Sequence, residues 1–226
     1  MGEKNRLFNA QEVKHPTVIQ KLIVASSPRK TFLMLIFLSS IIATLGLLNE
    51  NAFVVIGAML VAPILSPVLA IGMGMIVRDT RMILFSMIGL SLSVVIAVVT
   101  STVITFFALP LGTGNLLLQQ TDMGFMVPVA IAAGAAAAFA VAHESIREAV
   151  AGVAISVALL PPLVLVGIGL GASDWRMMTR ALELFGLNSI SIILVAMIVF
   201  AFLGFGRFKR SAEQAVKKER KVLNSK

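Results

Sequence analysis

The length of its charge-free apolar segments constrains this chain more than any other feature. Between Arg81 and Glu144 the single formal charge is that of Asp122. About 20 consecutive apolar residues suffice to cross a bilayer as a helix. Hydrophobic residues make up 58% of the chain and charged residues 13%, against about 25% charged residues in a soluble domain. The sequence therefore predicts an integral membrane protein.

We expect the fold to be all-α and polytopic, because a lipid-exposed backbone must satisfy its own hydrogen bonds. The alternation typical of an outer-membrane barrel is absent. Six apolar spans are predicted: Thr31–Leu48, Ala52–Val77, Met82–Ala108, Phe125–Ala142, Ala149–Ala172 and Leu184–Gly206.

Lys and Arg predict the orientation of these spans. With six spans and both ends inside, 17 of the 19 basic residues fall on the cytoplasmic side of an inner membrane, as the positive-inside rule requires. We expect the basic segments 1–30 and 207–226 to contact anionic lipid headgroups rather than nucleic acid. The C-terminal segment forms either a helix on the membrane surface or a solvated tail.

One stretch of the sequence is repeated later in the chain. GAMLVAPILSPVLAIGMGMIVRDTRM (57–82) and GVAISVALLPPLVLVGIGLGASDWRM (152–177) share eight identities in 26 positions at a constant offset of 95 residues. We interpret 31–110 and 125–206 as homologous three-span halves joined by an outer loop, 111–124. Because three is odd, the second half must enter the membrane inverted, as in many transporters. The alternative is a chance match of Gly and Pro.

Prolines interrupt the second span of each half. A proline removes a backbone donor and clashes with the preceding turn, and paired broken helices indicate a binding site at mid-membrane. Pro63, Ser66 and Pro67 are expected on one helical face, at the depth of Pro161 and Pro162. The alternative is a purely structural kink. The predicted substrate or ion path comprises Pro63, Ser66, Pro67, Ser93, Ser156, Pro161, Pro162 and Asn188.

Polar groups inside the spans are uncharged. The 95-residue offset places Ser93 on Asn188, and a buried Asn must find a partner or a ligand. Because no ionisable residue lies at mid-membrane, a proton antiporter with a buried carboxylate is disfavoured.

Polar clusters mark the ends of the spans. They act either as helix caps and solvated ion pairs or as a pair of gates. Their members are Asn49, Glu50, Asn51, Asp79, Arg81, His143, Glu144, Arg147, Asp174 and Arg176.

The fourth predicted span is rich in small residues, with ten Ala or Gly between Ala130 and Ala142. Small residues allow close helix packing in lipid, so we expect this helix to be central and packed against its own bundle or against a second subunit of a homo-oligomer; the alternative is a pore lining. No metal site, cofactor motif or catalytic set is found, and we expect no enzymatic activity.

The segments NAFVVIGAMLVAPILSPVLAIGMGMIVRD and VAISVALLPPLVLVGIGL resemble a prokaryotic membrane family, the "uncharacterised hydrophobic domain" or domain of unknown function 389. The resemblance covers about residues 15–205 and implies a prokaryotic membrane origin. Many members of the family carry an additional soluble domain. The residues themselves predict a transport protein for a small solute or ion. An oligomeric channel and a non-transporting scaffold with lipid-binding basic tails are the alternatives.

Overall fold

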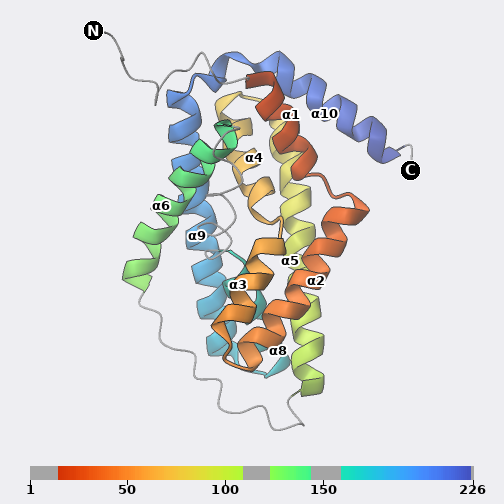
Figure 1. The fold of residues 1–226 in the computed structure, drawn as a ribbon, viewed down its shortest axis with the longest axis vertical. Coiled ribbons are helices and arrows are strands. Elements are labelled where there is room, and N and C mark those ends of the chain that lie inside the picture. The colour runs from red at the N-terminus through yellow and green to blue at the C-terminus, as the bar shows by residue number, and fades with distance from the viewer. Residues whose placement is uncertain (1–14, 109–122, 144–158, 225–226) are drawn as a thin grey trace.

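The computed structural model describes residues 15–108, 123–143 and 159–224. In these ranges the chain folds into helices and their connections, with no strand. The elements are α1 (His15–Ala25), α2 (Lys30–Leu48), α3 (Ala52–Val61), α4 (Leu65–Ile76), α5 (Thr80–Ala108), α6 (Met123–Ala142), α8 (Leu160–Gly171), α9 (Trp175–Phe202), the 3₁₀ turn η3 (Phe205–Arg207) and α10 (Lys209–Asn224) (Figure 1). The all-α class predicted from the sequence is confirmed.

Three helices, α2, α5 and α9, are long and apolar enough to cross a membrane. The pair α3 and α4 passes the same test together but is bent by 50° at its break. The described helices thus indicate a membrane protein with three such spans, or four if the bent pair forms one span. α6 and α8 are apolar but shorter.

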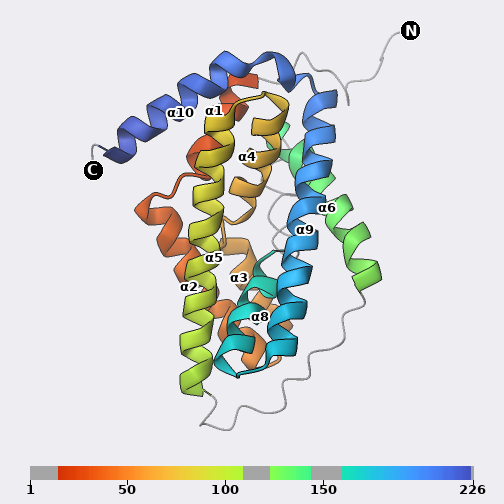
Figure 2. The same cartoon turned by 180° about the vertical axis from the view of Figure 1, so that it is seen from behind.

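The two longest helices, α5 and α9, run in opposite directions along the molecule (Figures 1 and 2). Each turns one apolar stripe outward, and the two stripes match at the 95-residue offset. The exposed side chains are Val95, Val99 and Val103 on α5 and Ile190, Leu194 and Ile198 on α9. Apolar side chains on an exposed helix face fit a lipid environment, where exposure carries no hydrophobic penalty.

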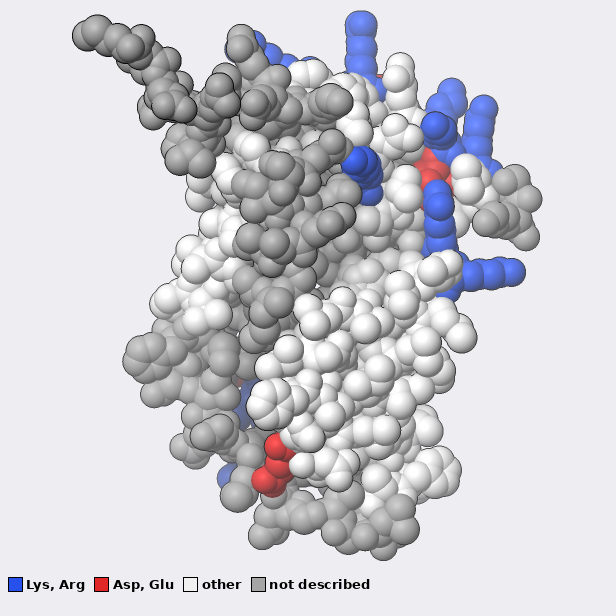
Figure 3. All heavy atoms as spheres, viewed as in Figure 1, with Lys and Arg blue, Asp and Glu red and all other residues white. Residues whose placement is uncertain are grey.

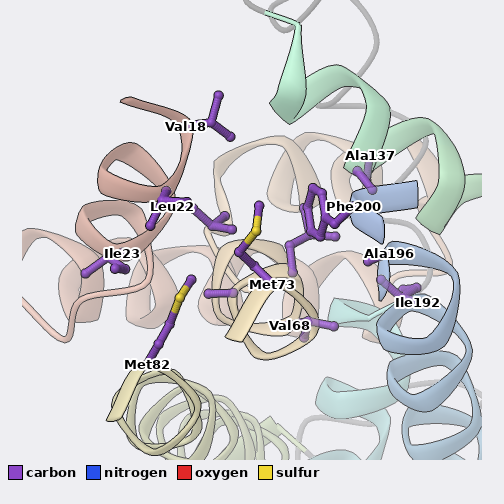
Figure 4. Close-up of a cluster of buried hydrophobic side chains, with 14 of the residues drawn as sticks. Val18, Leu22, Ile23, Val68, Met73, Met82, Ala137, Ile192, Ala196 and Phe200 are labelled. Carbon is purple, nitrogen blue, oxygen red and sulfur yellow. The ribbon is translucent and has the colours of Figure 1, made fainter. Parts of the chain in front are cut away.

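The short helices α4 and α8 form the centre of the bundle. In α4 every residue from Pro67 to Gly74 is buried, and α8 is buried on all but a few positions. A helix that is hydrophobic all round is expected inside a structure. In Figure 4 the side chains of α4 lie between those of α1 and those of α9.

The alanine-rich helix α6 packs against α9 of the same chain. A methyl group added to Gly134 would lie 3.0 Å from Cα of Ile192, so the two backbones approach closely. The packing role predicted for this span is therefore observed within one chain.

The terminal segments are more ordered than the sequence suggested. Segment 1–30 contains α1, which buries Val18, Ile19, Leu22 and Ile23 against the core. Segment 207–226 contains α10, which crosses one end of the bundle and packs on α1 (Figures 1 and 2). Helix α1 within segment 1–30 was not predicted from the sequence, although its apolar residues recur at helical spacing and close that end of the core.

Candidate functional site

The break between α3 and α4 follows from Pro63. Ala62 precedes it and adopts an extended conformation, with φ −72° and ψ 117°, as steric contact with the proline ring demands. The chain re-enters a helix at Leu65, where the N–H of Ser66 donates to the carbonyl of Pro63 at 3.3 Å. Because Pro63 lies in the break itself, the expected single helical face of Pro63, Ser66 and Pro67 was wrong.

Helix α8 also carries prolines at its start. It starts at Leu160 and is followed at once by Pro161 and Pro162, which need no hydrogen-bond partner in the first turn of a helix. Leu159 and Leu160 are both fully buried. The predicted site residue Ser156 lies outside the described residues. Both short helices, α4 and α8, therefore start inside the protein, where their first N–H groups have no partner within the helix.

The start of α4 lies near the buried polar residues of α9. A methyl group on Gly72 would lie 3.1 Å from the carbonyl oxygen of Ile193 and 3.3 Å from Cβ of Ala196. Both helices run in the same direction (Figure 1), so seven residues toward their N-termini, about 10 Å, lead to Leu65 on α4 and to Ser189 on α9. Ser189 lies four residues before Ile193 and seven before Ala196, on the helix face that packs on α4.

Two of the predicted path residues occupy corresponding buried positions. Ser93 on α5 and Asn188 on α9 are both buried, and the hydroxyl of Ser93 donates to the carbonyl of Gly89 at 2.9 Å. Ser189 is buried next to Asn188, and its hydroxyl has no hydrogen-bond partner in the described structure. The polar groups of α9 thus lie at the depth at which α4 begins.

Two helix–helix contacts at equivalent positions are each formed at a glycine. Just as Gly72 of α4 packs on α9, Gly167 of α8 packs on α5, where a methyl group would overlap the hydroxyl of Ser101 and lie 2.5 Å from the carbonyl of Val98. These contacts are equivalent at the 95-residue offset. They differ in polarity, because Thr102 donates a hydrogen bond of 3.1 Å to the carbonyl of Gly167, whereas Ile193 and Ala196 face Gly72.

The repeated Asp-x-Arg-Met segments form two matching helix caps. Oδ1 of Asp79 accepts from the N–H groups of Arg81 and Met82, and Oδ1 of Asp174 accepts from the two residues at the same offset. The residue before each Asp has a positive φ, 54° at Arg78 and 56° at Ser173. The capping role predicted for both aspartates is confirmed. Their surroundings differ, because Asp79 is 3% exposed while Asp174 is exposed.

The other expected gate residues also serve as caps where they are described. Oδ1 of Asn51 accepts from the N–H groups of Phe53 and Val54 at the start of α3, and Nδ2 of Asn49 donates to Leu45. Glu50 connects them with φ 51°. These contacts fit the capping alternative.

At the other expected gate, the structure describes one member. The ring of His143 stacks on Phe139, with centroids 4.2 Å apart, and its Nδ1 donates to the Phe139 carbonyl at 3.0 Å. Glu144 and Arg147 lie outside the described residues. Among the residues that are described, no three His, Asp or Glu side chains gather as metal ligands.

Two contacts that tie the terminal helices to the bundle were missed from the sequence. Nε and Nη2 of Arg29 each donate a hydrogen bond of 2.6 Å to the carboxylate of Glu219 on α10. His15, at the start of α1, donates from Nε2 to the carbonyl of Leu203 at 2.9 Å and stacks on Phe208. The spacing of Ala212, Val216, Glu219 and Leu223 was the available signal for a packed α10, because it places all four on one helix face.

A family of known proteins matches the part of the chain that contains these helices. Residues 59–194 match the family described as "Domain of unknown function (DUF389)", a range that includes the prolines at the starts of α4 and α8 and both glycines. The uncharacterized protein MJ0678 of Methanocaldococcus jannaschii is 29% identical over 188 residues, 82% of this chain. The chain spans 58% of the length of that relative. No solved structure matches the present chain. Because the family match covers more than half of the sequence, the chain belongs to the DUF389 family.

Proposed function

We propose that this protein moves a small solute or ion across a membrane, and that its site is framed by the starts of α4 and α8. The observation that carries the proposal is that both short helices begin at prolines inside the protein. Backbone groups released from helices at membrane depth are tolerated where they are buried in protein or line a wet cavity. Broken helices in matching positions of two halves are the arrangement of many carriers.

We further propose that the two halves are inverted repeats within six spans. Equivalent caps, positive φ residues, exposed stripes and glycine contacts recur at one offset of 95 residues. The α4–α5 turn and the α8–α9 turn lie at opposite ends of the bundle (Figure 1). These relationships support an inverted pair, and α1 and α10 at one basic end support placing both termini in the cytoplasm.

In this proposal the carrier works by movement of one half against the other. The contacts of Gly72 with α9 and of Gly167 with α5 both cross between halves, so α4 and α8 would slide along these faces. Ser66, Ser93, Asn188 and Ser189 supply hydrogen-bonding groups near the start of α4, and among the described residues no carboxylate accompanies them. This chemistry suits a neutral polar solute, or an ion held by hydroxyls and backbone groups.

The inverted topology is tested with single cysteines at Arg81 and Arg176. Both positions are exposed and equivalent at the 95-residue offset, and the chain has no cysteine of its own. An impermeant maleimide added to intact cells is expected to label Arg176→Cys, and to label Arg81→Cys only after permeabilisation. Labelling of both from one side contradicts the inversion.

Transport is tested with the purified protein in liposomes, by stopped-flow light scattering with glycerol and urea and by flux of K⁺, Na⁺, Cl⁻ and phosphate. Asn188→Ala and the double substitution Pro63→Ala/Pro67→Ala are expected to reduce any flux that the wild type shows. Pro128→Ala is the matched control, because Pro128 lies exposed inside the unbroken helix α6. Equal flux in all variants would remove the proline breaks from the path.

The same liposomes separate the alternatives. Saturable uptake with counterflow supports a carrier, and unitary conductance in a bilayer supports a channel. If neither is found and deletion from Lys209 onward abolishes the cellular function, a scaffold is supported instead.

A further inference from the structure

The end of the bundle that carries α1 and α10 is strongly basic. Blue side chains gather over these helices in Figure 3. Seven Lys and Arg residues between Arg207 and Lys221 are exposed. Glu219, which lies in the C-terminal half of α10, is buried and already paired with Arg29.

The apolar face of α10 is occupied. Ala212 and Val216 are buried in the core cluster that also contains Val18 and Ile19 of α1. An interfacial helix normally binds by inserting its apolar face below the headgroups. Because that face of α10 packs on protein, its basic face is what remains for a partner.

The C-terminal half of α10 lies at the edge of the bundle, where Glu219 and Leu223 still pack on it, and its end extends past that edge (Figures 1 and 2). Four exposed cations lie on this half: Lys217, Lys218, Arg220 and Lys221. None of them forms an ion pair within the described residues. In a protein whose long helices cross a bilayer, an arm that projects sideways at one end of the helices overlies the headgroups of that bilayer.

We propose that the C-terminal half of α10 is a docking surface for anionic phospholipid headgroups, held in place by the Arg29–Glu219 pair and bound by charge rather than by insertion. Each Lys or Arg near an anionic membrane surface raises the partition coefficient onto that surface by about fivefold. Four cations on one projecting arm therefore give a preference for phosphatidylglycerol over phosphatidylcholine. The attraction weakens as salt rises, because exposed charges are screened over about 10 Å at 0.1 M.

The test uses the full chain reconstituted in equimolar phosphatidylglycerol and phosphatidylcholine, extracted in mild detergent and purified. The ratio of the two lipids that remain bound is then measured. The distal variant is K217Q/K218Q/R220Q/K221Q, and the matched proximal variant is R207Q/K209Q/R210Q, which removes exposed cations from the part of the chain nearer the bundle. Gln preserves helix propensity at these positions.

Wild-type protein is expected to retain an excess of phosphatidylglycerol that falls in 0.5 M NaCl. The distal variant is expected to lose at least about fivefold of this excess, and the proximal variant to keep most of it. Circular dichroism and thermal unfolding of both variants check that α10 remains folded. An unchanged excess in a folded distal variant overturns the proposal, and so does an equal loss in both variants, because net charge alone would then explain it.

A second arm tests another polyanion. A short DNA duplex is added to the protein in nanodiscs made of phosphatidylcholine alone. Weak, salt-sensitive binding that is equal in the wild type and the distal variant agrees with a lipid surface. Tight binding of DNA that requires the four distal cations, together with an unaltered lipid ratio, would assign the surface to nucleic acid and overturn the proposal.

Discussion

Arg29 and Glu219 are 190 positions apart in the sequence and form a two-pronged ion pair, with both hydrogen bonds at 2.6 Å. The pair joins the turn between α1 and α2 to the C-terminal helix. The carboxylate side chain is 4% exposed and the guanidinium side chain 38% exposed. α10 is thus fastened to the bundle by one specific polar contact in addition to its apolar face.

Glu219→Gln is expected to loosen α10 and to lower the free energy of unfolding by about 2 kcal/mol. This is less than for a fully buried pair because Arg29 is partly solvated. Hydrogen exchange of α10 amides, measured by mass spectrometry, should rise while exchange in α5 stays unchanged. Arg29→Lys, which keeps the charge but loses the second hydrogen bond, is the matched control and should show a smaller effect.

The same pair predicts a pH dependence. Burial is the largest single influence and raises the pKa of Glu219, but the hydrogen bonds from Arg29, a contribution from Ser27 and the positive charge of Arg29 together outweigh it, and the pKa lies below its ordinary value. A lowered pKa in the folded state contributes stability above the ordinary carboxyl range, and this contribution is lost as pH falls through the folded pKa. Protection of the α10 amides against hydrogen exchange should therefore stay constant from about pH 5 to about pH 8. It should fall in stronger acid. Constant protection of wild-type α10 in strong acid would contradict this.

Substitution of alanine for three glycines should separate close packing from helix propensity. Gly167→Ala is expected to be the most damaging, by about 3 kcal/mol or more, because the methyl group meets both Ser101 and the Val98 carbonyl. Gly72→Ala should cost about 1 kcal/mol, because its contacts at 3.1 Å and 3.3 Å need a smaller shift.

Gly57→Ala is the control for this series, because nothing lies within 4 Å of the added methyl group. Alanine is the better helix former by about 1 kcal/mol, so this variant should be neutral or stabilised. Thermal unfolding in detergent gives the order. A Gly167→Ala protein as stable as Gly57→Ala would refute the crossing contact between α8 and α5.

Loss of the side-chain acceptor should destabilise the protein by a similar amount at both caps, whereas added salt should affect the two caps differently. Asp79→Ala and Asp174→Ala should each cost about 1 kcal/mol, and the Ser variants should restore most of it, because Ser also accepts at an N-cap. Screening by salt should affect the exposed Asp174 more than the buried Asp79. Unfolding of the four variants at low and high salt checks both statements.

Thr102→Val removes the hydroxyl that joins α5 to the carbonyl of Gly167. The loss should be about 1 kcal/mol, the usual net value of one such bond. Met197→Val, at the equivalent position of α9, is the control and should cost less, because the Met197 side chain has no hydroxyl to donate to the facing helix. Equal effects would mean that the hydroxyl adds nothing beyond its bond to Val98 within α5.

Much of the architecture follows from local chemistry that the sequence states directly. Pro63 interrupts a helix because a proline ring has no N–H and disfavours a helical residue before it. Pro161 and Pro162 begin one because the first turn of a helix needs no N–H from them. Asp79 and Asp174 cap the helices that follow because the carboxylate reaches the free N–H groups two and three residues ahead. Charge-free apolar runs dictated the helical class, since the backbone has no other way to bond in lipid.

Tertiary structure alone decided which segments meet. Neither propensity nor periodicity indicates that Gly72 lies on α9 and Gly167 on α5, because such contacts depend on how two helices cross rather than on either sequence by itself. For the same reason Arg29 reads as one more basic residue until α10 folds back on α1 and brings Glu219 beside it. The sequence determined where helices start, stop and face lipid, through interactions within a few residues. The fold decided how they are assembled, through packing between residues that are distant along the chain.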